Sequence, residues 1–212
     1  MICFALSSPA LAVAASRSVL VSLEPHLGRC TEAAVGRQVA EIGRSSSSVL
    51  SLPGGVSWAG VAPGDGYIFR INNQTDRIDP RARDIAVDSS FSLISQPYSL
   101  VNQRVAVRRE RAVFYELLVG QFTPEGTFAA AERKLPFLAN LGVTIIELMP
   151  VMHSCNGPRD WGYCPRAPFA VRPELGGSHG LKSFVDAAAG YGMGVALDVV
   201  YNHASAHSLL KN

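Results

Sequence analysis

The chain has 212 residues, 48% of them apolar and 17% charged, which is an ordinary composition for a globular protein. Its 19 basic and 17 acidic residues leave a net charge of +2, so no strong field would attract nucleic acid or an anionic membrane. No stretch reaches the ~18 consecutive apolar residues of a membrane span. We therefore expect neither nucleic acid nor a membrane as a partner.

The four cysteines show no metal-binding pattern. None belongs to a Cys-x-x-Cys pair, and a zinc site needs closely spaced Cys or His ligands, so we expect no metal and no cofactor. Cys155 and Cys164 fall in one predicted loop and could meet there. We expect them instead to be free thiols in a reducing compartment.

Residues 1–48 are not assigned to a domain and form a possible targeting or disordered segment that ends in the serine run at 45–48. Residues 1–23 hold one charge, Arg17, and no acidic residue. A secretory signal needs a basic start and an unbroken apolar core, which Pro9 interrupts. An organelle transit peptide and a partial N-terminus fit the segment about equally. We accordingly expect a cytoplasmic or plastid protein.

Residues 50–105 show the pattern of a small β domain. The segment 56–61 alternates apolar and polar residues, 63–66 is a Pro-Gly-Asp-Gly turn, and 67–71 alternates again, which predicts a hairpin. Residues 91–94 predict a further strand. A β-sandwich has about seven strands, and only three or four are recognisable here. We therefore expect 50–105 to be a partial antiparallel β-sandwich module.

From residue 112 the pattern changes to strands that alternate with helices. Continuous apolar strands of this kind indicate a parallel α/β sheet covered by helices. A (β/α)8 TIM barrel needs about 250 residues, so we expect 112–212 to be the first two to three β/α units of such a barrel and the chain to be an N-terminal fragment. The predicted elements are strands at 112–119, 143–149 and 195–200, a helix from Phe128 to Leu141 between Thr127 as N-cap and Gly142, a long loop at 151–179, and a helix around 181–188.

Polar residues gather where the third predicted strand ends, in the run Asp198-Val-Val-Tyr-Asn202-His203. A carboxylate inside an apolar strand is costly to bury unless it is paired. A single histidine in this place is more often structural than a ligand. Three polar side chains converge here on the C-terminal end of a strand, where α/β barrels place their chemistry, and this favours a functional site.

The stretch from Asp198 to His203 resembles the first signature region of the α-amylase superfamily of glycoside hydrolases and transglycosidases. Three further stretches agree in order and spacing, and the match over 113–212 is closest to 1,4-α-glucan branching enzymes and maltooligosyl trehalose trehalohydrolases. Residues 64–82 resemble the end of the β-sandwich that precedes the barrel in these enzymes. The further stretches are Tyr115–Phe128, Glu147–Val151, and Trp161–Tyr163 followed by Pro168–Ala170 and Gly176–Gly177.

The resemblance implies roles for five residues around one glucose subsite. Tyr163 would stack on the glucose ring next to the scissile bond, and His203 would hydrogen-bond a hydroxyl of the same glucose. Asp198 would lie beneath the site and orient an arginine of a later strand. Asn202 would shape the loop, and Trp161 would pack the loop rather than contact sugar.

Two positions of the substrate loop depart from the family pattern. Cys164-Pro165 stands where members more often have Asp-Gly or Asn-Pro, and Leu175 replaces a common tyrosine. Substrate preference is therefore not fixed by the resemblance.

The resemblance implies an enzyme that transfers or hydrolyses α-1,4-glucosidic bonds, with maltooligosaccharide, glycogen or starch as its partner. Family catalysis is retaining and uses an aspartate on the fourth strand, a glutamate on the fifth and a later aspartate, all beyond Asn212. We therefore expect no catalytic residue in this chain and no activity from it alone. A branching-enzyme fragment is the leading hypothesis, and a trehalohydrolase or debranching enzyme is the nearest alternative. The others are a non-catalytic glucan-binding remnant and a chain without a fold of its own.

Overall fold

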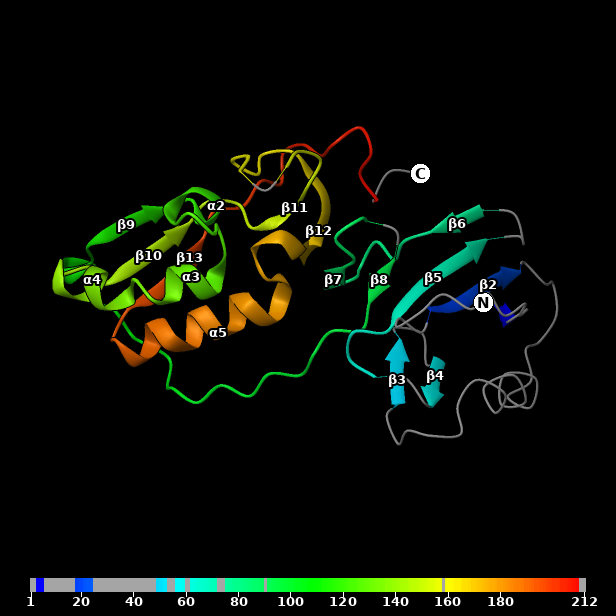
Figure 1. The fold of residues 1–212 in the computed structure, drawn as a ribbon, viewed down its shortest axis with the longest axis horizontal. Helices are drawn as coiled ribbons and strands as arrows, with labels where there is room; N and C mark the ends of the chain where they lie inside the picture. Colours follow the sequence, from blue (N-terminus) through cyan, green and yellow to red (C-terminus); the bar gives the residue numbers. More distant parts are fainter. Residues whose placement is uncertain are drawn as a thin grey trace. The chain divides into compact units, whose positions relative to one another are not determined.

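The computed structural model describes residues 3–5, 18–24, 49–52, 56–59, 62–71, 75–89, 91–157 and 159–209. The chain forms two compact units, one of residues 1–79 with 88–95 and the other of 80–87 with 96–212 (Figure 1). The serine run at 45–48, predicted to end the leader, lies outside the described residues.

The first unit consists of β-strands, with β5 (Gly66–Ile71) at its centre. β5 pairs in parallel with β2 and antiparallel with β6 and β8, while β1 extends the sheet next to β2. β3 and β4 form a separate antiparallel pair. The bounds of these strands are β1 Cys3–Ala5, β2 Ser18–Glu24, β3 Val49–Leu52, β4 Val56–Ala59, β6 Thr75–Arg77 and β8 Ser92–Leu93.

The predicted hairpin between 56–61 and 67–71 is wrong. β4 pairs with β3 instead, and the turn before β5 bonds to the strand at 91–94. The Gly64 N–H donates to the Ile94 carbonyl at 2.8 Å, and the Ile94 N–H donates to the Asp65 carbonyl at 2.9 Å. These bonds extend the ladder between β5 and β8, so the turn closes a long-range pairing. The strand predicted at 91–94 is confirmed as β8.

The second unit is built around three parallel strands in the order β13-β10-β9. Three short α-helices lie between β9 and β10 along the chain, and the longest helix lies between β10 and β13 (Figure 1). The parallel pairing of the three predicted strands is thereby confirmed. The elements are β7 Asp84–Ile85, η1 Arg109–Arg111, β9 Phe114–Leu117, α2 Val119–Phe122, α3 Phe128–Glu132, α4 Leu135–Asn140, β10 Ile145–Leu148, β11 Met152–Ser154, β12 Pro165–Val171, η2 Pro173–Leu175, α5 Gly177–Gly190 and β13 Gly194–Leu197.

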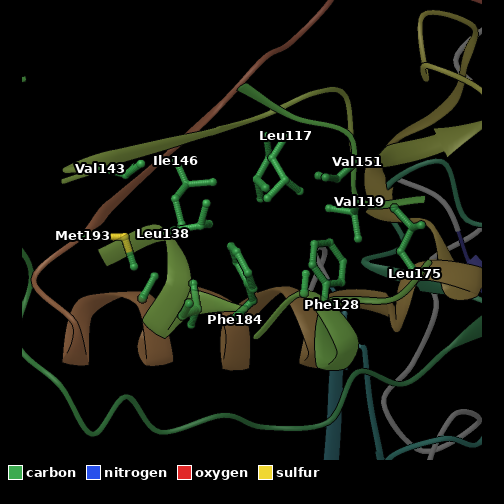
Figure 2. Packing of buried hydrophobic residues seen from close by; sticks show 14 residues of the cluster. Leu117, Val119, Phe128, Leu138, Val143, Ile146, Val151, Leu175, Phe184 and Met193 are labelled. Atoms are coloured by element: carbon green, nitrogen blue, oxygen red, sulfur yellow. The ribbon is translucent and has the colours of Figure 1, made fainter. Parts of the chain in front are cut away.

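One face of this sheet packs against the helices and forms the core (Figure 2). Leu117, Ile146 and Leu148 of the strands meet Phe128 of α3 and Phe184 of α5, and all five are buried. Each such side chain contributes about 1.5–3 kcal/mol by leaving water. Since successive strand residues point to opposite faces, Glu116 and Glu147, which are register partners, lie on the face away from the helices.

The helix predicted from Phe128 to Leu141 forms as two helices, α3 and α4. Its start is as predicted, because the Thr127 Oγ1 accepts the Ala130 N–H at 3.2 Å as an N-cap. Pro136 in the first turn of α4 has no N–H to bond the preceding turn, so the helix is interrupted there. Leu141 is 59% exposed and does not join the predicted apolar face.

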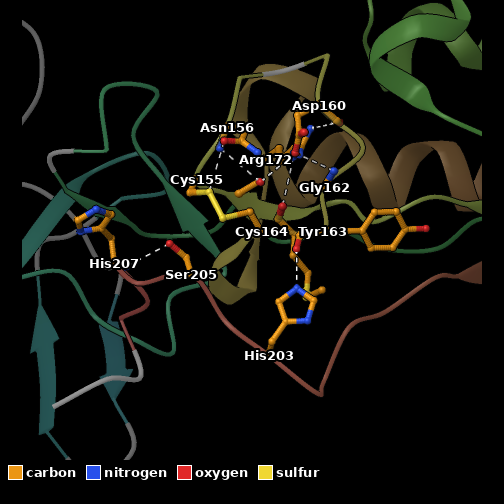
Figure 3. The surroundings of a disulfide bond; sticks show 12 residues. Cys155, Asn156, Asp160, Gly162, Tyr163, Cys164, Arg172, His203, Ser205 and His207 are labelled. Carbon is orange, nitrogen blue, oxygen red and sulfur yellow. Dashed lines mark hydrogen bonds and ion pairs between the residues drawn. A yellow bond between two sulfur atoms is a disulfide. The ribbon is translucent and has the colours of Figure 1, made fainter.

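The segment at 151–179 was predicted to be a loop, and it instead contains an irregular antiparallel pair, β11 and β12. Ser154 is the register partner of Pro165, so the next residues outward, Cys155 and Cys164, face each other. They form a disulfide with a Cα–Cα distance of 5.5 Å, and the Cys155 N–H donates to the Cys164 carbonyl at 2.9 Å (Figure 3). The expectation of free thiols at these two positions is therefore wrong.

Helix α5 is tied to the segment that precedes the first barrel strand. The Asp186 side chain of α5 is buried and accepts the backbone N–H of Val101 at 3.0 Å and of Asn102 at 2.7 Å. It also accepts the Tyr98 hydroxyl at 3.0 Å.

Among the described residues, no helix is both long and apolar enough to span a membrane.

Candidate functional site

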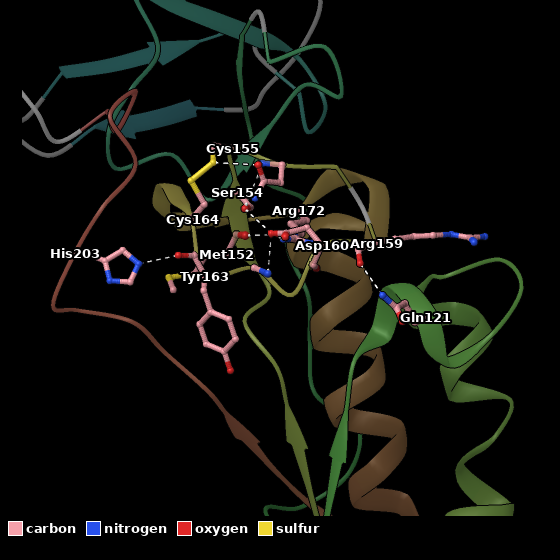
Figure 4. Close-up of polar contacts among 12 residues, drawn as sticks. Gln121, Met152, Ser154, Cys155, Arg159, Asp160, Tyr163, Cys164, Arg172 and His203 are labelled. Carbon is pink, nitrogen blue, oxygen red and sulfur yellow. Dashed lines mark hydrogen bonds and ion pairs between the residues drawn. A yellow bond between two sulfur atoms is a disulfide. The ribbon is translucent and has the colours of Figure 1, made fainter.

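The three residues predicted to bind substrate, Tyr163, Asp198 and His203, lie together where the parallel strands end. β13 stops at Leu197, so Asp198 follows the strand rather than lying inside it, and its N–H donates to the Leu148 carbonyl of β10 at 2.8 Å. The Tyr163 hydroxyl donates to the Asp198 carboxylate. The His203 Nε2 lies 2.7 Å from the Tyr163 carbonyl oxygen (Figure 4). Because a carbonyl only accepts, Nε2 carries the proton of this contact.

The neighbouring carboxylates favour the neutral form of Tyr163 even more than in a free tyrosine. Its hydrogen bond to Asp198 raises the pKa of Tyr163 to about 12, with burial and the negative charges of Asp198, Glu116 and Glu147 acting in the same direction. The hydroxyl therefore stays neutral and donates near pH 7. This bond fixes one end of the ring, while 37% of the Tyr163 side chain remains exposed.

The two other predicted site residues lie at the surface. Asn202 is exposed, and its Oδ1 lies 3.0 Å from the His203 Nδ1, which places it beside the histidine. Trp161 is 61% exposed, so the loop that it was expected to pack covers only part of its side chain. Its aromatic face is available to solvent or to a ligand.

The same loop contains an ion pair between a buried arginine and a half-buried aspartate, which the sequence analysis did not predict. Arg172 at the end of β12 is only 2% exposed, and its guanidinium lies 3.4 Å from the Asp160 carboxylate (Figure 4). Burial lowers the pKa of Arg172, and the Asp160 and Glu174 charges oppose that shift. Burial alone would raise the pKa of Asp160, but the Gly162 N–H and the Arg172 charge outweigh it and lower the pKa.

One signal in the sequence could have suggested this pair. Arg172 directly follows the apolar run from Phe169 to Val171, where a charge needs a buried partner. Which acid supplies the partner follows only from the path of the chain between the two strands.

A cleft of about 560 Å³ lies next to the polar cluster. Asp198 and His203 line it together with apolar side chains that include Phe169, whereas Tyr163 does not. In the part of the chain that the structure describes, no three His, Cys, Asp or Glu side chains are grouped to hold a metal ion. At the C-terminal edge of the parallel sheet, Asp198, Tyr163 and His203 can form hydrogen bonds, and the exposed ring of Trp161 lies in the same loop as Tyr163.

Comparisons with known proteins identify the family of this arrangement. The family model described as "Alpha amylase, catalytic domain" matches residues 76–211. A malto-oligosyltrehalose trehalohydrolase from Saccharolobus solfataricus is 39% identical over 146 residues, which are 68% of this chain and 26% of the relative. One from Deinococcus radiodurans is 53% identical over 91 residues, 43% of this chain and 15% of the relative. The 1,4-alpha-glucan branching enzyme GlgB of Vibrio parahaemolyticus is 38% identical over 110 residues, 48% and 14% of the two chains.

Solved structures with a fold similar to that of this chain include enzymes described as an alpha amylase and a pullulanase. A candidate alpha amylase from Salmonella typhimurium has a TM-score of 0.66 at 39% identity and covers 76% of this chain and 29% of its own. The Group B Streptococcus pullulanase SAP in complex with maltotetraose has a TM-score of 0.55 at 25% identity, with 74% and 28% covered. The chain spans about a quarter or less of the curated relatives named here. With the family model matching well over half of its residues, the chain belongs to the α-amylase family and shares that family's TIM-barrel fold.

Proposed function

We propose that this chain carries part of the glucan-binding site of an enzyme that acts on α-1,4-linked glucans. The observation that supports this most is the meeting of Tyr163, Asp198 and His203 at the C-terminal ends of the parallel strands. An aromatic ring packs well against the apolar face of a sugar, and the flanking polar groups suit its hydroxyls. The ligand is a maltooligosaccharide segment, and glycogen and starch are two forms in which such segments occur.

A role in trehalohydrolase chemistry is favoured over branching. Two named trehalohydrolases reach 39% identity over 68% of the chain and 53% over 43% of it, whereas the branching enzyme reaches 38% over 48%. Branching, the leading hypothesis from the sequence, becomes the second candidate. Nothing in the comparisons supports a plastid location.

Each residue of the cluster has a proposed role. Tyr163 stacks on one glucose ring, and His203 hydrogen-bonds a hydroxyl of that glucose. Asp198 accepts the Tyr163 hydroxyl and so orients the tyrosine ring. It also orients an arginine that a later strand supplies. Asn202 steadies His203 through its Nδ1, and Trp161 offers a second aromatic face. The 212-residue polypeptide binds glucan without cleaving it, because the retaining carboxylates of the family belong to later strands.

The division of the chain is part of the same proposal. Residues 50–105 hold a partial β-sandwich module, whose sheet is extended by β1 and β2 from the segment 1–48, and 112–212 form the first β/α units of the barrel. Because Tyr98, Val101 and Asn102 bond to Asp186 of α5, limited proteolysis that releases a stable piece beginning near residue 96 would support two separate modules. Cleavage inside 113–209 before any cut near 96 would contradict it.

The experiment that tests the function measures maltotetraose binding by calorimetry. Tyr163→Ala removes the stacking surface and is expected to weaken binding about two- to tenfold, which corresponds to about 0.5–1.5 kcal/mol for an aromatic contact. Tyr191→Ala is the matched control, because Tyr191 is 51% exposed at the C-terminal end of α5. Equal losses in the two variants, or no binding by the unaltered protein, would contradict the proposal.

The same assay separates the two candidate functions. A malto-oligosyltrehalose that binds more tightly than the maltooligosaccharide of equal length would support the trehalohydrolase role. Equal affinity for the two would leave the branching role as the better one.

A further inference from the structure

The loop that carries Tyr163 is organised around the buried Arg172. An arginine with 2% of its side chain exposed is stable only when its charge and its N–H groups find partners. Its Nε donates to the Met152 carbonyl at 3.3 Å, and one terminal nitrogen donates to the Asp160 carbonyl at 3.0 Å. The other terminal nitrogen lies 3.4 Å from the Asp160 carboxylate. The guanidinium thus joins β11 to the tip of the loop.

Asp160 passes this restraint to the residues that follow it. Its carboxylate accepts the Gly162 N–H at 2.9 Å, in addition to the contact with Arg172 (Figure 3). It also accepts the Ser154 hydroxyl at 3.3 Å (Figure 4). Three donors from three parts of the hairpin therefore meet on one carboxylate. Tyr163 is the residue directly after Gly162, so its backbone starts from this fixed point.

The turn at Gly162 is packed tightly between the end of β10 and Arg172. Gly162 has a φ of +95°, and a Cβ there would lie 2.4 Å from the Pro150 carbonyl oxygen and 3.2 Å from a terminal nitrogen of Arg172. The arginine therefore borders the space that a Cβ at position 162 would occupy, and it is also bonded to Asp160. A smaller side chain at position 172 would leave the turn without support on that side.

We infer that Arg172 and Asp160 are positioning residues that hold Tyr163 in the geometry that binds glucan. The inference deepens the proposed glucan-binding function and rests on it. His203 and Asp198 restrain Tyr163 at its carbonyl and its hydroxyl, and the Arg172–Asp160 pair restrains the chain that leads into it. A loop ordered before the ligand arrives loses less conformational entropy on binding, so disrupting the pair weakens affinity without removing any sugar contact.

The test compares Arg172→Met, Asp160→Asn and the double variant. Each single variant is expected to weaken maltotetraose binding about tenfold, and the double variant no further than either, because coupled residues are not additive. Arg172→Lys keeps the charge but cannot make the same planar set of bonds, so it is expected to rescue only part of the loss. The matched control is Arg133→Met, which removes an exposed arginine paired with Glu125 on the same unit and should leave affinity unchanged.

Two further measurements separate positioning from general stability. Amide hydrogen exchange of the peptide 159–165 is expected to accelerate about tenfold in Arg172→Met at a urea concentration where the core stays folded. Asp160→Asn, which retains an acceptor for the Gly162 N–H, keeps the test available if Arg172→Met does not fold. Losses of affinity that merely follow the unfolding midpoint across the variants would overturn the inference.

Failure of the two proposals is distinguishable. If the unaltered protein does not bind maltotetraose, the proposed function fails, and hydrogen exchange still decides the role of the pair. Unchanged exchange of 159–165 in both single variants would overturn the positioning role. Faster exchange with unchanged maltotetraose affinity would overturn it as well, because the order of the loop would then not matter for binding.

Discussion

Replacing Gly162 with alanine tests the most crowded point of the candidate site. The added methyl group would lie 2.4 Å from the Pro150 carbonyl oxygen and 2.9 Å from the Pro150 Cβ. Real Cβ atoms essentially never come closer than 3.0 Å to such atoms, so the chain must move by at least 0.6 Å, the difference between 3.0 and 2.4 Å. That movement would displace the turn that leads into Tyr163.

The magnitude has two parts. A left-handed backbone costs an alanine about 1–2 kcal/mol, and forcing a side chain into an occupied space costs about 1–3 kcal/mol more. The free energy of unfolding should therefore fall by about 2–5 kcal/mol, a large share of the total for a domain. Gly142→Ala isolates the first part, because Gly142 has a φ of +89° and no atom within 4 Å of its added Cβ.

Urea unfolding followed by circular dichroism gives both values, and maltotetraose calorimetry gives the functional consequence. Gly142→Ala should lose about 1 kcal/mol and keep its affinity. Gly162→Ala should lose more stability and bind measurably more weakly. If the two variants lose the same stability within about 0.5 kcal/mol, the Pro150 contact is not as tight as described and the reasoning fails.

Three further changes test other parts of the second unit. Phe184→Ala empties a fully buried position and should cost about 3–5 kcal/mol in urea unfolding, whereas Phe137→Ala, at a position 59% exposed, should stay within about 0.5 kcal/mol. Cys155→Ser opens a short disulfide loop and should cost about 2–3 kcal/mol, and dithiothreitol should then destabilise the unaltered protein but not the variant. Backbone N–H bonds lower the pKa of Asp186, so its stabilising effect is present above the unfolded value and is lost as pH falls through the folded value. Unfolding midpoints between pH 6 and 2.5 should therefore fall more steeply for the unaltered protein than for Asp186→Asn, and parallel curves would contradict this.

The parallel part of the fold is readable from local patterns. Apolar strands and the Thr127 cap depend on residues close together in the chain, and the structure places these elements where the patterns predict them. The interruption between α3 and α4 also has a local signal, which is Pro136 within the apolar helical pattern. The regular apolar spacing nevertheless led to the prediction of one continuous helix, which is wrong. The prediction of a β4–β5 hairpin is wrong for a different reason. Alternation predicts strands, but their partners depend on residues far apart in the chain, such as Ile94.

The candidate site was also predictable only in part, namely for the residues that follow a strand of the parallel sheet. Asp198 and His203 follow the same strand of the parallel sheet, so their place at the C-terminal edge of that sheet follows from the strand pattern. Tyr163 comes from a loop, and only the resemblance to the family suggested it. The predicted strand extends past Asp198, whereas β13 ends at Leu197. The Asp198 carboxylate therefore lies outside the apolar strand, where it accepts the Tyr163 hydroxyl.

What the sequence could not reveal is how the loop at 151–179 is held, and this has a physical cause. Strands of a parallel sheet share one ladder and one core, so their positions are determined by many residues at once. The Tyr163 loop has only the short irregular β11–β12 pair, and it depends besides on single contacts such as the Cys155–Cys164 bond and the Arg172–Asp160 pair. Each is between residues that no periodic pattern links. Cys164 also stands at a position where the family pattern has a different residue. The loop can therefore change its anchors while the strands below it keep their pattern, and the ligand preference of this chain is expected to depend on those anchors more than on the sheet.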